Sequence, residues 1–101
     1  LDAYREIFSL CEKNGWNAVL VTPPYPAVYT ECFPSEMLAR FCEITEALSE
    51  EAGVPWLNYS QDSEFTENFA YFKNIDHLNL AGAHAFAAEL QPKLAELGLW
   101  R

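Results

Sequence analysis

Ala18-Val19-Leu20-Val21-Thr22-Pro23-Pro24 is the stretch of sequence that decides the fold of this chain. Its four consecutive apolar residues are typical of a β-strand buried on both faces, as in a parallel sheet covered by helices. We expect the strand to run from Trp16 to Thr22. It must end at Pro23-Pro24-Tyr25-Pro26, because proline has no amide hydrogen for the ladder, and this segment is predicted to be an exposed turn or extended loop.

Amphipathic helices are predicted on both sides of this strand. Before it, apolar residues recur at helical spacing from Leu1 to Cys11, and Asn14-Gly15 supplies the stop. After it, a second helix of roughly four turns is expected from Ser35 or Glu36 to Ala52, with Gly53 as its cap.

The alternation continues in the C-terminal half of the chain. Val54–Tyr59 is predicted to be a short strand, and the polar segment Ser60–Asn68 a loop that carries Phe65 and Phe69 inward. A last helix is expected from Leu80 to about Leu97, with a kink or restart at Pro92.

Helix, strand, helix, strand, helix with short connections is typical of an open α/β sheet with parallel strands. Two parallel strands do not make a stable sheet alone, and the apolar strand needs neighbours on both edges. We therefore expect further strands to precede Leu1 or to come from another copy of the chain. The sequence starts inside a helical pattern without an initiator Met, so it looks like a piece of a longer protein.

Composition limits the number of domains and the classes of partner. The 101 residues are 50% hydrophobic and 15% aromatic, enough for one small domain with one core. Fifteen acidic and six basic residues give a net charge of −9. This charge argues against nucleic acid or an anionic membrane as a partner, because phosphate binding needs clusters of Lys and Arg.

Three cysteines, Cys11, Cys32 and Cys42, cannot all pair within one chain. Cys11 and Cys42 fall on apolar helical faces, which favours buried free thiols. No CxxC or Cys/His pair has metal-ligand spacing, so no metal site is expected. The sequence shows no signal peptide and no apolar run near 18 residues, so no transmembrane segment is predicted in this chain.

One stretch has the character of a functional site: Phe72-Lys73-Asn74-Ile75-Asp76-His77-Leu78-Asn79-Leu80-Ala81-Gly82-Ala83. A polar loop places His77 just before a helix rich in small residues, and Asn79 suits the N-cap of that helix. A base can be aimed from such a position. The alternative is a capping or surface histidine. His84 lies within the helix and is interpreted as structural.

These residues carry a resemblance to a known family. The order Val19–Pro24, helix, Gly53–Tyr59 and then Asn74–Ala83 resembles the C-terminal half of an SGNH/GDSL-type hydrolase. More narrowly, it is similar to the branch with a His-Leu-Asn-x-x-Gly-Ala ending, found among esterases and O-acyltransferases of bacterial envelopes. The resemblance implies a flavodoxin-like three-layer α/β/α sandwich, of which this chain would supply about two parallel strands and three helices as residues 1–101.

The resemblance also implies roles for individual residues. His77 matches the general base, and no cofactor is implied. The position three residues earlier, an Asp in the family, is Asn74, which can accept the imidazole N–H but brings no charge. In an unrelated serine protease, the change of this Asp to Asn lowers turnover about 10⁴-fold. Asp76 is the alternative orienting group, although the side chain of an adjacent residue usually points away from the ring.

The nucleophile block of the family is absent. None of the serines combines a sharp turn with an oxyanion donor, so the isolated chain is predicted to be inactive; they are Ser9, Ser35, Ser49, Ser60 and Ser63. Pro24 and Tyr25, with Tyr29, are candidates for binding an ester or acylated-glycan substrate at the carboxyl edge of the sheet. Pro23–Pro26 could alternatively bind a proline-recognising domain.

Two functions of different classes follow from this sequence. The first is the C-terminal portion of a serine-dependent esterase or O-acyltransferase, which supplies the histidine and pairs with a missing N-terminal half or another copy. The second is a non-catalytic α/β interaction or scaffold domain with a degenerate triad, for which Asn74 is the best indication. The compartment stays open between the bacterial envelope and the cytoplasm.

Overall fold

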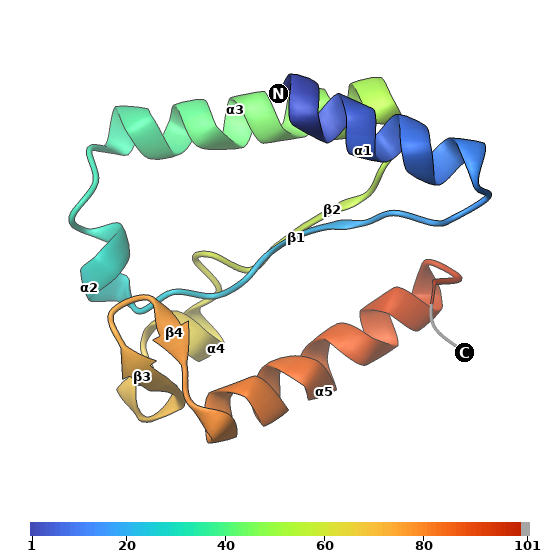
Figure 1. Ribbon diagram of the computed structural model, residues 1–101. Coiled ribbons are helices and arrows are strands. Elements are labelled where there is room, and N and C mark those ends of the chain that lie inside the picture. The colour runs from blue at the N-terminus through green and yellow to red at the C-terminus, as the bar shows by residue number, and fades with distance from the viewer. Residues whose placement is uncertain (100–101) are drawn as a thin grey trace. The chain divides into compact units, whose positions relative to one another are not determined.

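The computed structural model of the chain describes residues 1–99 and is mixed α/β, mostly helical, with two small sheets (Figure 1). The chain divides into two compact units. The first unit comprises residues 1–22 and 33–58, and the second comprises residues 23–32 and 59 onward. The predicted α/β class is confirmed, with one sheet of two parallel strands.

The first unit contains two long helices and the parallel sheet: α1 (Asp2–Lys13), β1 (Leu20–Thr22), α3 (Ser35–Ala52) and β2 (Trp56–Asn58). Strands β1 and β2 pair in parallel, with Leu20 opposite Trp56 and Thr22 opposite Asn58. The indole N–H of Trp56 donates to the hydroxyl oxygen of Thr22 across the pair at 2.9 Å.

Strand β1 is shorter and more exposed than predicted. It begins at Leu20 rather than Trp16, because a longer ladder would place Val19 opposite Pro55, which has no N–H to donate. Its expected burial on both faces is also wrong, since Val21 is 36% exposed. A two-stranded sheet leaves an outer edge on each strand, which accounts for this exposure.

The two predicted helices of the first unit are confirmed, but their burial differs. No residue of α1 is buried, and Tyr4 and Ile7 are about half exposed. Helix α3 ends at Gly53, whose φ of 66° is the left-handed conformation expected of a glycine cap. Leu48 of α3 and Val54 just beyond it are the buried apolar residues of this unit.

The second unit combines one long helix, α5 (Leu80–Glu96), with shorter elements around the buried ring of Phe65: α2 (Ala27–Thr30), α4 (Ser63–Thr66), η1 (Phe69–Tyr71), β3 (Phe72–Asn74) and β4 (His77–Leu78). Phe65 is 1% exposed and lies 5.8 Å, centroid to centroid, from the rings of both Tyr71 and Phe86. The prediction that Phe65 points inward is confirmed. The same prediction for Phe69 is wrong, because this residue begins η1 on its solvent side and is 58% exposed.

Several local predictions in the second unit need correction. The proline segment is extended as predicted, but it is not an exposed loop, because Pro24 and Pro26 are fully buried. Helix α4 and the hairpin of β3 and β4 lie where loops were expected, and α2 lies in a segment for which no element was predicted. Helix α5 contains Pro92 and continues to Glu96 without restarting.

The cysteines and the helix lengths bear on two further predictions. The three thiols are free, but Cys11 and Cys42 are half-buried rather than buried, and Cys32 is exposed. Within residues 1–99, none of the helices has the length and apolar character needed to cross a membrane.

Candidate functional site

His77 is positioned by a tight β-hairpin. Strands β3 and β4 pair antiparallel, with Phe72 opposite Leu78 and Asn74 opposite His77. Only Ile75 and Asp76 lie between the last pair, so a sequence spacing of three brings the side chains of Asn74 and His77 to the same end of the hairpin. The turn is stabilised by the amide oxygen of Asn74, which accepts the backbone N–H of Asp76 at 3.1 Å.

The ring of His77 meets two oxygen atoms at one nitrogen. Its Nδ1 lies 3.0 Å from Oδ1 of Asn74 and 2.6 Å from Oδ1 of Asp76. The Asn74 atom must be the oxygen, because it also accepts a backbone N–H. With two acceptors facing Nδ1, the proton of the neutral ring belongs there, and Nε2 carries the lone pair. This is the tautomer that a general base requires.

The geometry of Asp76 differs from the sequence expectation. Its side chain does not point away from the ring but makes the shorter of the two contacts with His77. The two-residue turn accounts for this, since it brings the carboxylate of its second residue back to Nδ1 of the following imidazole. A carboxylate at this distance orients the ring through a charge-assisted hydrogen bond.

The site is open to water. The side chains of His77 and Asp76 are 67% and 45% exposed. Solvent therefore screens their attraction, and the pair contributes little to folding stability. Catalysis at such a site depends on a covering surface that excludes water, because the electrostatic interactions strengthen only in a drier surrounding.

The start of α5 is attached to η1 directly behind the hairpin. Asn79 is the N-cap, as predicted, and its Oδ1 accepts the N–H of Gly82 at 2.8 Å. Gly82 is buried against the backbone of η1: a Cβ built there would lie 2.1 Å from the carbonyl oxygen of Tyr71. The glycine of the His-Leu-Asn-x-x-Gly motif is thus required by close packing.

Tyr25 belongs to the same unit as the hairpin, and its ring stacks on Tyr29 with centroids 4.9 Å apart. Burial raises the pKa of the Tyr25 phenol, and the nearby Tyr29 and the carboxylate of Asp76 raise this pKa further. The phenol therefore stays protonated at neutral pH and can donate a hydrogen bond. Tyr25 lies just before α2, which Figure 1 shows next to the hairpin, and this agrees with its electrostatic coupling to Asp76.

Pro24, the other predicted substrate-binding residue, is less than 2% exposed. Its ring offers no surface to a substrate in this structure and instead fixes the segment that carries Tyr25. The role of Tyr25 itself stays a prediction.

The serines of α1, α3 and α4 do not have the geometry of a nucleophile. Ser9 lies within α1, and Ser35 and Ser63 are the first residues of α3 and α4. Ser49 donates its hydroxyl to the carbonyl oxygen of Val54 at 2.5 Å, which serves the end of α3. None of these four is at a sharp strand-to-helix turn of the kind that exposes a nucleophile.

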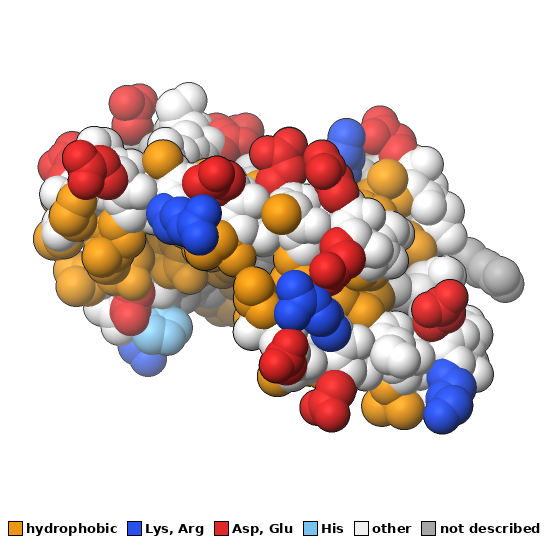
Figure 2. All heavy atoms as spheres, turned by 90° about the horizontal axis from the view of Figure 1, so that it is seen from above, with side chains coloured by type: hydrophobic (Ala, Val, Ile, Leu, Met, Phe, Trp, Pro, Cys, Tyr) orange, Lys and Arg blue, Asp and Glu red, His pale blue; other side chains and the backbone are white. Residues whose placement is uncertain are grey.

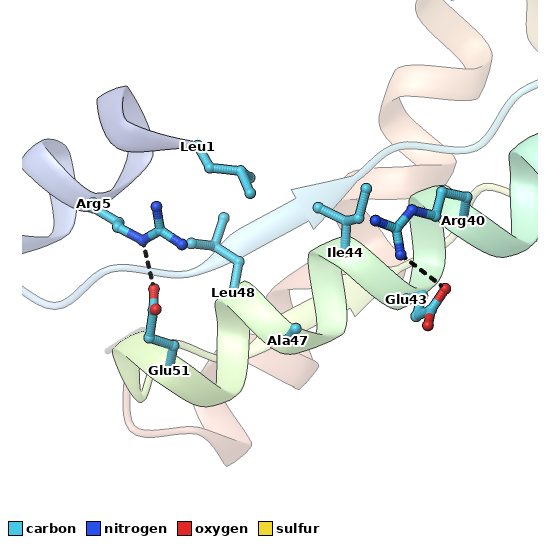
Figure 3. Close-up of a pocket in the computed structure, with 8 residues that line it drawn as sticks. All are labelled: Leu1, Arg5, Arg40, Glu43, Ile44, Ala47, Leu48 and Glu51. Atoms are coloured by element: carbon cyan, nitrogen blue, oxygen red, sulfur yellow. Dashed lines mark hydrogen bonds and ion pairs between the residues drawn. The ribbon is translucent and has the colours of Figure 1, made fainter.

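A pocket of about 260 Å³ in the first unit is a weaker candidate (Figure 3). It brings Arg5 and Arg40 to the rim of an apolar floor, but each guanidinium group is already paired: Arg5 with Glu51 at 2.8 Å and Arg40 with Glu43 at 3.3 Å. These carboxylates neutralise the charge that an anionic ligand would need. Among residues 1–99 no group of three acidic, cysteine or histidine side chains is arranged to hold a metal ion, and His84 is exposed on α5.

Sequence reasoning missed the hairpin and the attachment of α5 to η1. The signal for the hairpin was present in Asn74, a residue whose side chain commonly stabilises the start of a turn. The contact of Gly82 with Tyr71 had no such signal, because it joins residues through space. Comparison with models of protein families, with curated proteins and with solved structures finds no match to this chain.

Proposed function

We propose that this chain supplies the general base of a serine-dependent ester hydrolase or O-acyltransferase of the SGNH type, with a flavodoxin-like fold completed by further sequence. His77 is the base, Asp76 and Asn74 orient it, and the nucleophilic serine comes from outside these 101 residues. The observation that carries the proposal is the pair of acceptors on Nδ1 of His77, which leaves Nε2 available to take a proton.

The hairpin also suggests how the departure from the family triad is compensated. Asn74 provides a neutral acceptor where the family has a carboxylate, and Asp76 brings a carboxylate to the same nitrogen from the adjacent position. The charge that stabilises an imidazolium is therefore present, although it comes from a different residue. A net charge of −9 favours neutral or cationic esters over anionic ones as substrates.

The test is hydrolysis of p-nitrophenyl acetate by protein that contains this chain together with its serine-bearing segment. His77→Ala should lower turnover by about 10²-fold to 10⁴-fold, the usual contribution of a general base, with an unchanged circular dichroism spectrum. Asp76→Asn should cause a larger loss than Asn74→Ala, because it alone removes a charge. Equal rates for His77→Ala and the unaltered protein would overturn the proposal.

The isolated chain provides the matching control. It should not be labelled by a fluorophosphonate probe, because that reagent needs an activated serine. Strong labelling that disappears with one Ser→Ala substitution would place the nucleophile inside the chain and contradict the assignment of roles.

The exposed apolar surface of the first unit favours a second candidate, a non-catalytic interaction domain. A groove of about 260 Å³ is lined mainly by apolar side chains of α1, β1, α3 and β2, among them Phe41 and Trp56. Figure 2 shows exposed apolar side chains between acidic ones. Patches of this kind mark surfaces that bind other proteins or chain segments. Light scattering measures whether the chain associates, and a hydrophobic dye reports its exposed apolar surface. A monomer that binds no such dye would count against this candidate.

A further inference from the structure

Besides the backbone bond that its carbonyl oxygen accepts from Ala83, Asn79 makes three hydrogen bonds, which join the start of α5 to η1. Its Oδ1 accepts the N–H of Gly82 and so caps α5. Its Nδ2 donates to the carbonyl oxygen of Ala70 at 2.6 Å, and its backbone N–H donates to that of Tyr71 at 2.8 Å. The side chain thus joins the start of α5 to η1 at Ala70, and the backbone N–H adds a second bond at Tyr71, the last residue of η1.

The hairpin around His77 is short and irregular, and the packing of Gly82 against Tyr71 supports its C-terminal side together with the bonds of Asn79. Strand β4 has two residues, and its pairing with β3 is irregular between Phe72 and Asn74. The position of the ring therefore depends on what fixes the chain on either side of the hairpin. On the N-terminal side η1 leads directly into β3, and on the C-terminal side Asn79 attaches the chain to that same η1.

We propose that Asn79 is a positioning residue for His77, which acts by closing the β3–β4 hairpin onto η1 through its bond to Ala70. This inference rests on the proposed role of His77 as the base. Asparagine is required because its amide is both acceptor and donor, so that it caps the helix and reaches Ala70 together. A cap residue without the donor supports the helix and keeps the backbone bond to Tyr71, but it loses the second bond, to Ala70, that fixes the hairpin against η1.

Asn79→Asp separates these two tasks. Aspartate is as good an N-cap as asparagine, so α5 and its circular dichroism signal should be retained. Its carboxylate has no N–H for Ala70 and would face a carbonyl oxygen that now lies 2.6 Å from Nδ2. We expect the nitrogen NMR signals of the His77 ring to change from those of a fixed Nδ1–H tautomer to an average of two tautomers. Esterase turnover should fall about tenfold or more, as expected for a displaced catalytic group, with KM little changed.

Asn68→Asp is the matched control, because Asn68 also caps a helix, accepting the N–H of Ala70 at 3.3 Å. It should leave the His77 ring signals unchanged. Asn79→Ser, which keeps a capping oxygen on a shorter side chain, should reproduce the ring change if Asn79→Asp does not fold.

A fixed Nδ1–H tautomer in both folded Asn79 variants would overturn the positioning role. This outcome differs from failure of the proposed function, in which His77→Ala leaves turnover unchanged whatever the state of the ring.

Discussion

The two units of this chain differ in the length of their helices and strands and in how deeply their apolar side chains are buried. The first unit has two long helices and the parallel strands, yet its buried apolar residues are Leu48 and Val54. Apart from α5, the second unit has short elements, yet it contains Phe65, which is 1% exposed. Long amphipathic elements need another surface to cover their apolar faces, whereas short elements can wrap around one large ring.

Helix capping shows the same difference. In the first unit the N-cap positions of α1 and α3 are Leu1 and Pro34, and neither has a side-chain capping bond. In the second unit Asp62, Asn68 and Asn79 each accept a backbone N–H at the start of a helix. Each such cap contributes about 1 kcal/mol, so the second unit has local stabilisation that the first lacks.

The largest effect is expected from removing the central ring of the second unit. Phe65→Ala should lower the free energy of unfolding by about 3–5 kcal/mol, because it leaves a cavity beside Tyr71 and Phe86. Chemical denaturation measures the loss. Hydrogen exchange should rise first in η1 and α5, the elements that carry those two partners.

Leu48→Ala is the matched change in the first unit, where Leu48 is 5% exposed. It should cost about 2–3 kcal/mol, at the low end for such a substitution, since surrounding side chains can relax toward the apolar groove. Its exchange effect should be concentrated in α3 and β2. If both variants raised exchange uniformly over the whole chain, the distinction between the two units would fail.

A smaller effect is expected at the contact behind the hairpin. Gly82→Ala places a methyl group 2.1 Å from the carbonyl oxygen of Tyr71 and 2.9 Å from Cδ2 of Leu78, so η1 and α5 must separate. Overpacking of this kind costs about 1–3 kcal/mol, which outweighs the gain of up to about 1 kcal/mol in helix propensity. The fall in the midpoint temperature of thermal unfolding measures this net loss of stability.

The control for Gly82→Ala is the reverse change at the next residue. Ala83 is exposed on the same turn of α5. Ala83→Gly should therefore lower the free energy of unfolding only by the difference in helix propensity, up to about 1 kcal/mol. A Gly82→Ala protein at least as stable as the unaltered chain would mean that α5 does not lie against η1 as described.

The fold could be predicted from the sequence where a pattern is local. Helix α3 starts at Ser35 and ends at Gly53 as its periodicity and glycine cap indicate, and β2 lies inside the predicted Val54–Tyr59. Burial could not be predicted in this way. The apolar run of β1 predicts a covered strand, but burial depends on neighbours that these residues do not provide.

In the candidate site, too, only the features that depend on a local pattern could be predicted. Asn79 was identified as a cap because the capping pattern spans only a few residues. The orientation of Asp76 was not, because it depends on the two-residue turn that pairs Asn74 with His77. Whether His77 acts as a base stays a prediction that the enzymatic test addresses.

The smallest expected effect is a pH dependence in the second unit. Burial, Tyr29 and Asp76 raise the pKa of Tyr25 above its ordinary value of 10.0, so the folded protein holds the phenol proton more tightly than the unfolded chain. This contribution to stability is complete below pH 10 and is lost as the pH rises through the raised pKa. Tyr25→Phe should therefore flatten the decline of unfolding free energy above pH 10, measured by urea denaturation at several pH values.

Tyr59→Phe is the comparison, because burial also raises the pKa of Tyr59, whose coupled groups do not include Asp76. Adding Asp76→Asn should lessen the effect of Tyr25→Phe but not that of Tyr59→Phe; equal changes in both would mean that Tyr25 is not coupled to the hairpin.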